Sequence, residues 1–265
     1  MVQGQIDVEG YIAMNRLKEY YNSVRIILDE LYENTEVYQK AGRLLAEAVR
    51  EKRLAHIIGT EMHSSLSAED VFFRAGSLLN INPLFDPTFS VTHSASRSLY
   101  LKDANFCGKF LVEYYRNIHK GDVMIIVDTD GVGRACREVV QKSKELGLTI
   151  IVITSKRFSE SISKDCSFRN DDEQNLCDMK EVDLVIDSKV PAFDTVLRFE
   201  ALKAEAGWVS TIANSFILNS ILLATLEIIE KENIKADIWG NFYESAGLSQ
   251  NEGYIDEYID KIKHL

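Results

Sequence analysis

Apolar residues change their spacing along the chain, and this change predicts the order of helices and strands. Between residues 11 and 49 they recur every three or four positions, which is typical of helices. Two helices with a break near Asn34 are expected there. Short β-rich runs then alternate with helical stretches, which predicts a parallel sheet. The predicted strands are residues 56–58, 78–81, 123–127, 149–154 and 183–187.

Two of these runs, 123–127 and 150–153, are apolar at successive positions, as expected for strands covered on both faces. The expected fold is therefore α/β, a doubly wound five-stranded parallel sheet sandwiched by helices. A single domain is predicted, with an N-terminal helical arm (1–50), the sandwich (51–235) and a C-terminal segment (236–265). The helices after the arm are predicted at 68–75, 104–117, 134–146, 209–232 and 252–263.

Composition narrows the possible functions. The net charge of -11 disfavours binding to nucleic acid or to anionic membranes, because both would repel the protein. The four cysteines form no C-x-x-C pair, and we expect reduced thiols. No basic and then apolar leader is visible near the start, so a cytoplasmic location is predicted.

The uncharged stretch at residues 206–226 is about long enough to span a bilayer. It also contains serine, threonine and asparagine side chains that would need hydrogen-bond partners in lipid. We therefore predict a helix buried inside a soluble protein.

In such a sheet, ligands bind where the strands end and the following helices begin. The turns at 59–65, 128–133, 154–159 and 188–194 are called the first to fourth turns below. Hydroxyl side chains at helix starts can hold an anion or a polyol, and they can equally serve as helix caps. The sequence alone leaves both roles open for these candidate substrate-binding residues: Ser64, Ser65, Thr154, Ser155, Ser210 and Thr211.

Several residues follow one another in an order that is typical of a known family. They are His63, Ser64, Glu69, Arg74, Ala75, Gly76, Asn82 and Pro83, followed by 121–126, 151–155, 185–187, Pro191, Asp194, 210–212 and Asn241. With them the chain resembles the sugar-isomerase (SIS) domain proteins, in particular an uncharacterised branch related to phosphoheptose isomerases. That branch has a Gly-Thr-Gly-His-Ser turn, a helix ending in Arg-Ala-Gly-Gly and a Val-Asn-Pro strand. The resemblance implies a sugar or sugar-phosphate ligand. A homo-oligomer is also expected, because the N-terminal arm has apolar residues to spare for a dimer contact, and packing of the arm on its own sheet is the alternative.

The second turn departs from that family. The family's Ser-Asn-Ser-Gly pattern, which the resemblance implies binds phosphate, is replaced by Asp128, Thr129, Asp130 and Gly131. A carboxylate donates no hydrogen bond at neutral pH and repels phosphate. We expect this loop to bind a neutral or amino-bearing carbohydrate, a metal, or nothing.

Aldose–ketose isomerisation requires a base that moves a carbon-bound proton and an acid that polarises the carbonyl group. Glu69 is the candidate base, because the resemblance places it on the helix that carries the catalytic glutamate. His63 and His93 are the candidate acids. Solvated surface side chains are the alternative for all three. No cofactor and no resident metal site is predicted.

Two further functions compete with an isomerase. The fold could be kept by an inert ligand sensor or partner subunit, since fold alone does not establish activity. Alternatively, Asp128 and Asp130 resemble the first motif of Mg²⁺-dependent haloacid-dehalogenase-type phosphohydrolases, where they would act as nucleophile and general acid. An EF-hand calcium loop is excluded, because its first and last ligand positions would be Ile126 and Arg137.

Overall fold

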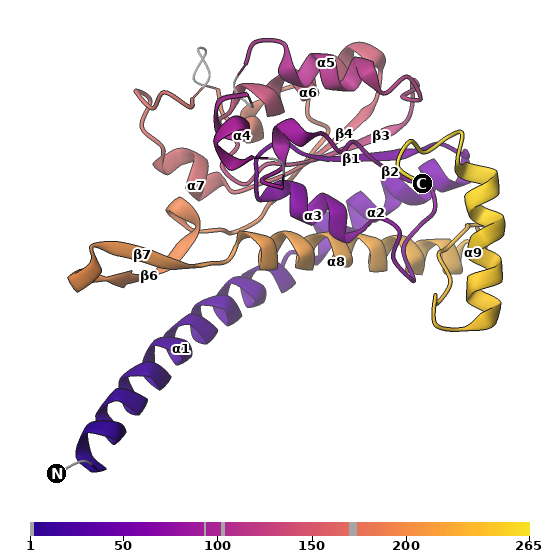
Figure 1. Cartoon of the computed structure of the whole chain (residues 1–265). Coiled ribbons are helices and arrows are strands. Elements are labelled where there is room, and N and C mark those ends of the chain that lie inside the picture. The colour runs from indigo at the N-terminus through magenta and orange to yellow at the C-terminus, as the bar shows by residue number, and fades with distance from the viewer. Residues whose placement is uncertain (1–2, 93, 102–103, 170–173) are drawn as a thin grey trace.

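A five-stranded parallel sheet forms the centre of the computed structural model (Figure 1), which describes residues 3–92, 94–101, 104–169 and 174–265. Its strand order is β2-β1-β3-β4-β5, which confirms the predicted α/β class. In the register, Gly59 of β1 lies beside Val127 of β3, and Val127 lies beside Ile153 of β4. The first three turns therefore begin at one edge of the sheet. The strands are β1 (Ala55–Gly59), β2 (Ile81–Pro83), β3 (Val123–Val127), β4 (Thr149–Thr154) and β5 (Leu184–Asp187).

Helices cover both faces of this sheet, as the uninterrupted apolar strands predict. Ile125 belongs to the apolar cluster beneath α2 (Thr35–Arg50) and α8 (Ser210–Lys231). Ile126, the next residue of β3, belongs to the cluster beneath α5 (Cys107–Tyr114) and α6 (Arg134–Leu146). Successive side chains of a strand point to opposite faces, so each strand contributes to two cores. Each fully buried isoleucine stabilises the fold by about 1.5–3 kcal/mol relative to an exposed one.

The arm forms two helices, α1 (Gln3–Tyr32) and α2, with the break at Asn34 as predicted. In Figure 1, α1 extends away from the sheet, and the β6–β7 hairpin (Thr195–Phe199 and Ala204–Trp208) projects beside it. The hydroxyl of Tyr20 donates a hydrogen bond to the carbonyl of Trp208 (2.9 Å) and ties the two together. The hairpin was not predicted, because its second strand, Ala-Glu-Ala-Gly-Trp, consists mainly of alanine, glycine and glutamate, which are depleted in strands.

Three predicted elements are displaced in the structure. The helix expected at 68–75 is α3 (Ser64–Asp70), which ends before Phe73 and Gly76 adopt positive φ angles of 51° and 85°. The helix expected at 252–263 is α9 (Ser245–Tyr258). Strand β2 begins at Ile81, and Leu78 instead forms an isolated bridge with Ile238. The remaining described elements are α4 (Ala95–Leu101), α7 (Lys156–Ser161) and the 3₁₀ turns Pro87–Phe89, Leu176–Asp178, Ala192–Asp194 and Glu200–Leu202.

Helix α8 contains most of the uncharged stretch and is long and apolar enough to cross a membrane by length and composition. Its polar residues Asn214 and Thr225 are buried, at 1% and 0% exposure. The hydroxyl of Thr225 donates to the carbonyl of Ile221 (2.7 Å), and Asn214 bonds to the second turn. Each of these two buried side chains thus donates a hydrogen bond inside the fold.

Candidate functional site

The first turn holds α3 very close to the end of β1. A Cβ atom on Gly59 would lie 2.3 Å from the backbone of Ser64 and Ser65, so only glycine fits here. Glu61 accepts hydrogen bonds from the backbone N–H of His63 (2.9 Å) and of Ser64 (2.6 Å), and from the Ser64 hydroxyl (2.5 Å). A carboxylate of the chain itself therefore occupies the start of α3.

The second turn is closed by Asp128, which is almost completely buried. Its Oδ1 accepts the backbone N–H of Gly131 (2.8 Å), and its Oδ2 accepts the hydroxyl of Thr60 (2.6 Å). Burial, with the nearby carboxylates of Asp130 and Glu61, raises the pKa of Asp128 well above its ordinary value. The hydrogen bonds from Thr60 and Gly131 oppose this rise. Asp128 thus fills the position in which an anion would meet the loop backbone.

Asp130 and Gly131 complete the same turn. Asp130 is half-buried, and its Oδ1 accepts the N–H of Val132 (3.1 Å). Gly131 has a φ of 63°, and a Cβ atom there would lie 2.4 Å from the Thr154 hydroxyl oxygen and 2.9 Å from that of Ser159. Glycine is required for both its backbone conformation and its close packing.

A chain of polar side chains joins the first turn, the second turn and α8. Asn214 donates from Nδ2 to the Thr129 hydroxyl (3.1 Å), which lies 3.2 Å from the Ser64 hydroxyl. Because the Ser64 hydroxyl donates to Glu61, its oxygen can accept a hydrogen bond from Thr129. The side-chain hydrogen bonds of this series therefore all point towards Glu61. The Oδ1 of Asn214 and the hydroxyl of Thr154 are buried without a hydrogen-bond partner. Neither group is exposed to solvent, and neither lies in the cavity described below.

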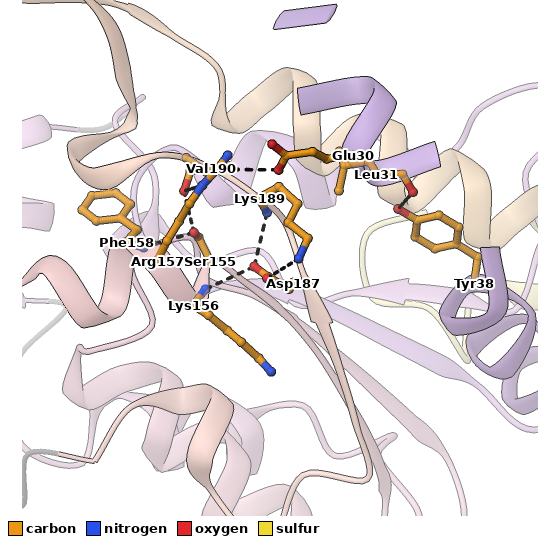
Figure 2. A network of polar contacts seen from close by, with 10 residues as sticks. All are labelled: Glu30, Leu31, Tyr38, Ser155, Lys156, Arg157, Phe158, Asp187, Lys189 and Val190. Carbon is orange, nitrogen blue, oxygen red and sulfur yellow. Dashed lines mark hydrogen bonds and ion pairs between the residues drawn. The ribbon is translucent and has the colours of Figure 1, made fainter. Parts of the chain in front are cut away.

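The third and fourth turns are tied by their own side chains (Figure 2). Ser155 caps α7 by accepting the N–H of Phe158 (3.2 Å) and donates to the carbonyl of Val190 (2.6 Å). Asp187 accepts from the Lys189 ammonium (2.7 Å) and from the backbone N–H of Lys156 (3.2 Å). Of the two roles left open for Ser155, the structure shows helix capping.

Arg157 links these turns to the arm. Its Nε donates to the carbonyl of Val190 (3.1 Å), and its guanidinium lies 3.5 Å from the carboxylate of Glu30 in α1 (Figure 2). The arm is thus connected to the edge of the sheet that carries the turns.

The start of α8 is also capped from within the chain. Asp194 accepts from the backbone N–H groups of Val209 (3.0 Å) and Ser210 (2.7 Å), and from the Ser210 hydroxyl (2.7 Å). Its φ of 65° is an uncommon conformation for aspartate. Ser210 is buried in this cap, and the side chain of Thr211 is exposed.

A cavity of about 290 Å³ opens beside the first turn, and we call it the Glu69 cavity. Glu69, the predicted base, lies in its wall together with Ser65, Asp86 and His264. Apolar side chains form much of the remaining wall. The lining residues are Gly59, Ser65, Ala68, Glu69, Leu84, Phe85, Asp86, Pro87, Phe89, Ser90, Thr92 and His264.

One of the two predicted acids, His63, is not brought to this cavity. His63 is exposed at the start of α3 and does not line the cavity. His93 lies outside the described residues. The structure instead places His264 in the cavity wall, a residue that sequence reasoning did not select. No motif surrounds His264 in the sequence, and only tertiary packing brings it near α3.

Sequence reasoning also missed Glu61 and Asn214. Glu61 occurs within the Gly-Thr-Glu-Met-His-Ser turn, where a carboxylate three residues before the helix start could have been recognised as a cap. Asn214 is one turn into α8, and its polarity in an apolar helix was the available signal.

Asp128 and Asp130 lie in one turn, as a phosphohydrolase would require, and backbone N–H groups occupy an oxygen of each. Within the part of the chain that the structure describes, no group of three or more histidine, cysteine, aspartate or glutamate side chains is placed to hold a metal ion. The arrangement of this turn favours internal closure over Mg²⁺ coordination.

A five-stranded doubly wound sheet with its polar turns at one edge defines the class as an α/β protein of the SIS type. The sequence profile of the SIS domain matches residues 19–155, and the chain belongs to this family. A phosphoheptose isomerase from Francisella tularensis has a similar fold, with a TM-score of 0.50, 14% identity, and coverage of 82% of this chain and 98% of that one.

Relatives with similar sequences extend over almost the whole chain. A UPF0309 protein of Shouchella clausii is 26% identical over 253 residues, covering 95% of this chain and 98% of its own length. A UPF0309 protein of Listeria monocytogenes is 28% identical over 244 residues, covering 92% and 95%. The recognised branch of the family is therefore confirmed.

Proposed function

We propose that this SIS-domain protein binds a carbohydrate in the Glu69 cavity and interconverts its aldose and ketose forms. The observation that carries this proposal is a cavity at the ligand-binding edge of the sheet, with Glu69 in a wall that is otherwise partly apolar. Its volume of about 290 Å³ is at the low end of small-molecule sites and suits a single sugar. The hydroxyls of Ser65 and Ser90 supply polar contacts for such a ligand.

The bound sugar is expected to be neutral or amino-bearing. Three carboxylates, those of Glu61, Asp128 and Asp130, surround the turn in which the family pattern has serines. The loop N–H groups of Gly131 and Val132 are already bonded to Asp128 and Asp130. A phosphate would therefore be repelled by the carboxylates of Glu61 and Asp130 and would find these donors in use.

Thermal unfolding of the full chain in the presence of free sugars, amino sugars and sugar phosphates tests the proposal, because a ligand that binds the native state raises its stability. We expect free or amino sugars to raise the melting temperature and their phosphates to raise it less. Stabilisation by phosphates alone would contradict the assignment of the second turn.

An inert sensor is the second candidate, because the hydroxyls of Ser64, Ser155 and Ser210 are all used in internal hydrogen bonds. The two candidates differ in proton chemistry. An isomerase exchanges the carbon-bound proton of its sugar with solvent, and a sensor binds the sugar without exchange. Deuterium incorporation from D₂O, followed by proton NMR on a stabilising sugar, distinguishes them.

We also propose that the arm pairs with a second copy of the chain. Leu17 and Tyr21 of α1 are 68% and 62% exposed, and Trp208 of the adjoining hairpin is 72% exposed. The two elements that carry them, α1 and the β6–β7 hairpin, project from the body of the molecule (Figure 1). Light scattering should give a dimer or larger oligomer for the natural chain and a smaller species for the double variant Leu17→Asp, Tyr21→Asp. An unchanged mass would contradict this pairing.

A further inference from the structure

The segment that follows α9 returns across the body and forms part of the Glu69 cavity. Ile262 is buried in the fold at 1% exposure, and the side-chain amide of Asn117 donates to the carbonyl of Lys261. These contacts place the ring of His264 5.1 Å from the ring of Phe85. A residue far from Glu69 in the sequence thereby lines the same cavity.

The hydrogen bonds of Tyr115 determine the proton position on His264. The Tyr115 hydroxyl lies 2.9 Å from the carbonyl of Phe85 and also contacts Nε2 of His264. It has one hydrogen, which the carbonyl requires because it cannot donate. Nε2–H of His264 must then donate to the Tyr115 oxygen, and Nδ1 carries a lone pair. Among the described residues, Nδ1 of His264 has no hydrogen-bond partner.

The surroundings of His264 also favour its neutral form. Burial, and then the neighbouring Lys263 ammonium, lower the pKa of His264. The Lys263 ammonium lies over the rings of Tyr114 and Tyr115, at 3.1 and 4.9 Å from their centroids. A neutral imidazole with an unpartnered lone pair can accept a proton from a hydroxyl group and pass it on.

We propose that His264 is the second acid–base group of the Glu69 cavity and shuttles a proton between two neighbouring sugar oxygens. This inference rests on the proposed function. Glu69 takes the proton from the carbon beside the aldehyde, the C–H electrons form the C=C bond, and the carbonyl electrons move to the first oxygen. Nδ1 of His264 takes the proton from the second oxygen and delivers it to the first. Glu69 returns its proton to the former aldehyde carbon as the ketone forms, so protons and electrons balance.

The two groups can be separated by measuring proton exchange and product formation in the same sample. The probes are D-glucose, D-mannose and D-arabinose, each incubated in D₂O with the full chain. In His264→Gln we expect ketose formation to fall at least about 100-fold, the scale of a lost acid–base group, while exchange at the second carbon persists. In Glu69→Gln both should be lost. The matched control is His119→Gln, which removes an exposed histidine outside the cavity.

The outcomes distinguish this inference from the function on which it rests. Ketose formation that is unchanged in His264→Gln would overturn the shuttle and leave the isomerase. An absence of binding and exchange with all three sugars would overturn both. Addition of free imidazole to His264→Gly should restore part of the ketose formation, which a purely structural residue would not show. Nitrogen NMR of the natural chain should also show the Nε2–H form of His264, and an Nδ1–H form would contradict the assignment.

Discussion

The second turn and the Glu69 cavity lie at the same edge of the sheet, and they differ in how their polar groups are used. In the second turn, Asp128 is bonded to Thr60 and Gly131, and Asp130 is bonded to Val132. In the cavity, Glu69 is exposed and Nδ1 of His264 has no partner among the described residues. The comparison supports the proposal that a ligand binds beside α3, because the side chains of the second turn are used in hydrogen bonds within the fold.

The largest effect is expected from Glu69→Gln. Loss of a general base slows proton transfer about 10²–10⁴-fold, and the exposed position of Glu69 predicts little change in folding. Deuterium exchange on a bound sugar measures the loss, and urea unfolding checks the fold. Asp70→Asn is the matched control, because Asp70 is the next residue of α3 and is absent from the cavity wall. Equal rates for Glu69→Gln and the natural chain would remove Glu69 from the mechanism.

A strong effect on stability is expected from Gly131→Ala. The added Cβ would lie 2.4 Å from the Thr154 hydroxyl oxygen, in a backbone conformation that favours glycine. The free energy of unfolding should therefore fall by about 2–4 kcal/mol. Gly253→Ala is the control, because that helical glycine has open space around it and alanine favours helix by up to about 1 kcal/mol. Urea unfolding of both variants measures the difference. Similar stabilities would show that the second turn is not rigidly closed.

A smaller, pH-dependent effect is expected from Asp128→Asn. The folded pKa of Asp128 is raised, so the folded state keeps a proton that the unfolded chain loses above about pH 4. The protonated Asp128 side chain contributes its full stabilisation below about pH 4, and this stabilisation is lost as the pH rises towards the folded pKa of Asp128. Asparagine does not titrate. As the pH rises from 4 to 7, the free energy of unfolding of the variant should therefore increase by about 1–2 kcal/mol relative to that of the natural chain.

Urea unfolding at several pH values in this window tests that gain. Asp256→Asn, at an exposed position of α9, should follow the pH profile of the natural chain. A constant difference between Asp128→Asn and the natural chain across the window would contradict the raised pKa.

Most of the fold could be predicted from the sequence, because apolar runs such as 123–127 and 149–154 reflect burial on both faces of a strand. The family's turn pattern also located the second turn and its aspartates. The candidate site was harder to predict from the sequence than the fold. Ser155 caps α7 through the N–H of Phe158, a local role that the sequence allows, but its hydroxyl also donates to the carbonyl of Val190 in a different turn, a contact that no local pattern shows. His264 reaches the cavity through packing of Ile262 and Tyr115, which no local pattern encodes.

The smallest effect expected is a gain of phosphate binding in the double variant Asp128→Ser, Asp130→Ser. It removes two carboxylates, supplies two hydroxyl donors and releases the N–H of Gly131. Inorganic phosphate should bind this variant at least about tenfold more tightly than the natural chain, a difference of about 1.4 kcal/mol. Thermal shift measures it. The control Asp128→Ala, Asp130→Ala removes both carboxylates without adding a hydrogen-bond donor, so a gain confined to the serine variant would assign phosphate binding to the added hydroxyl donors. Equal stabilisation of the natural chain by phosphate would show that the second turn is still open to anions, and the contrast with the Glu69 cavity would fail.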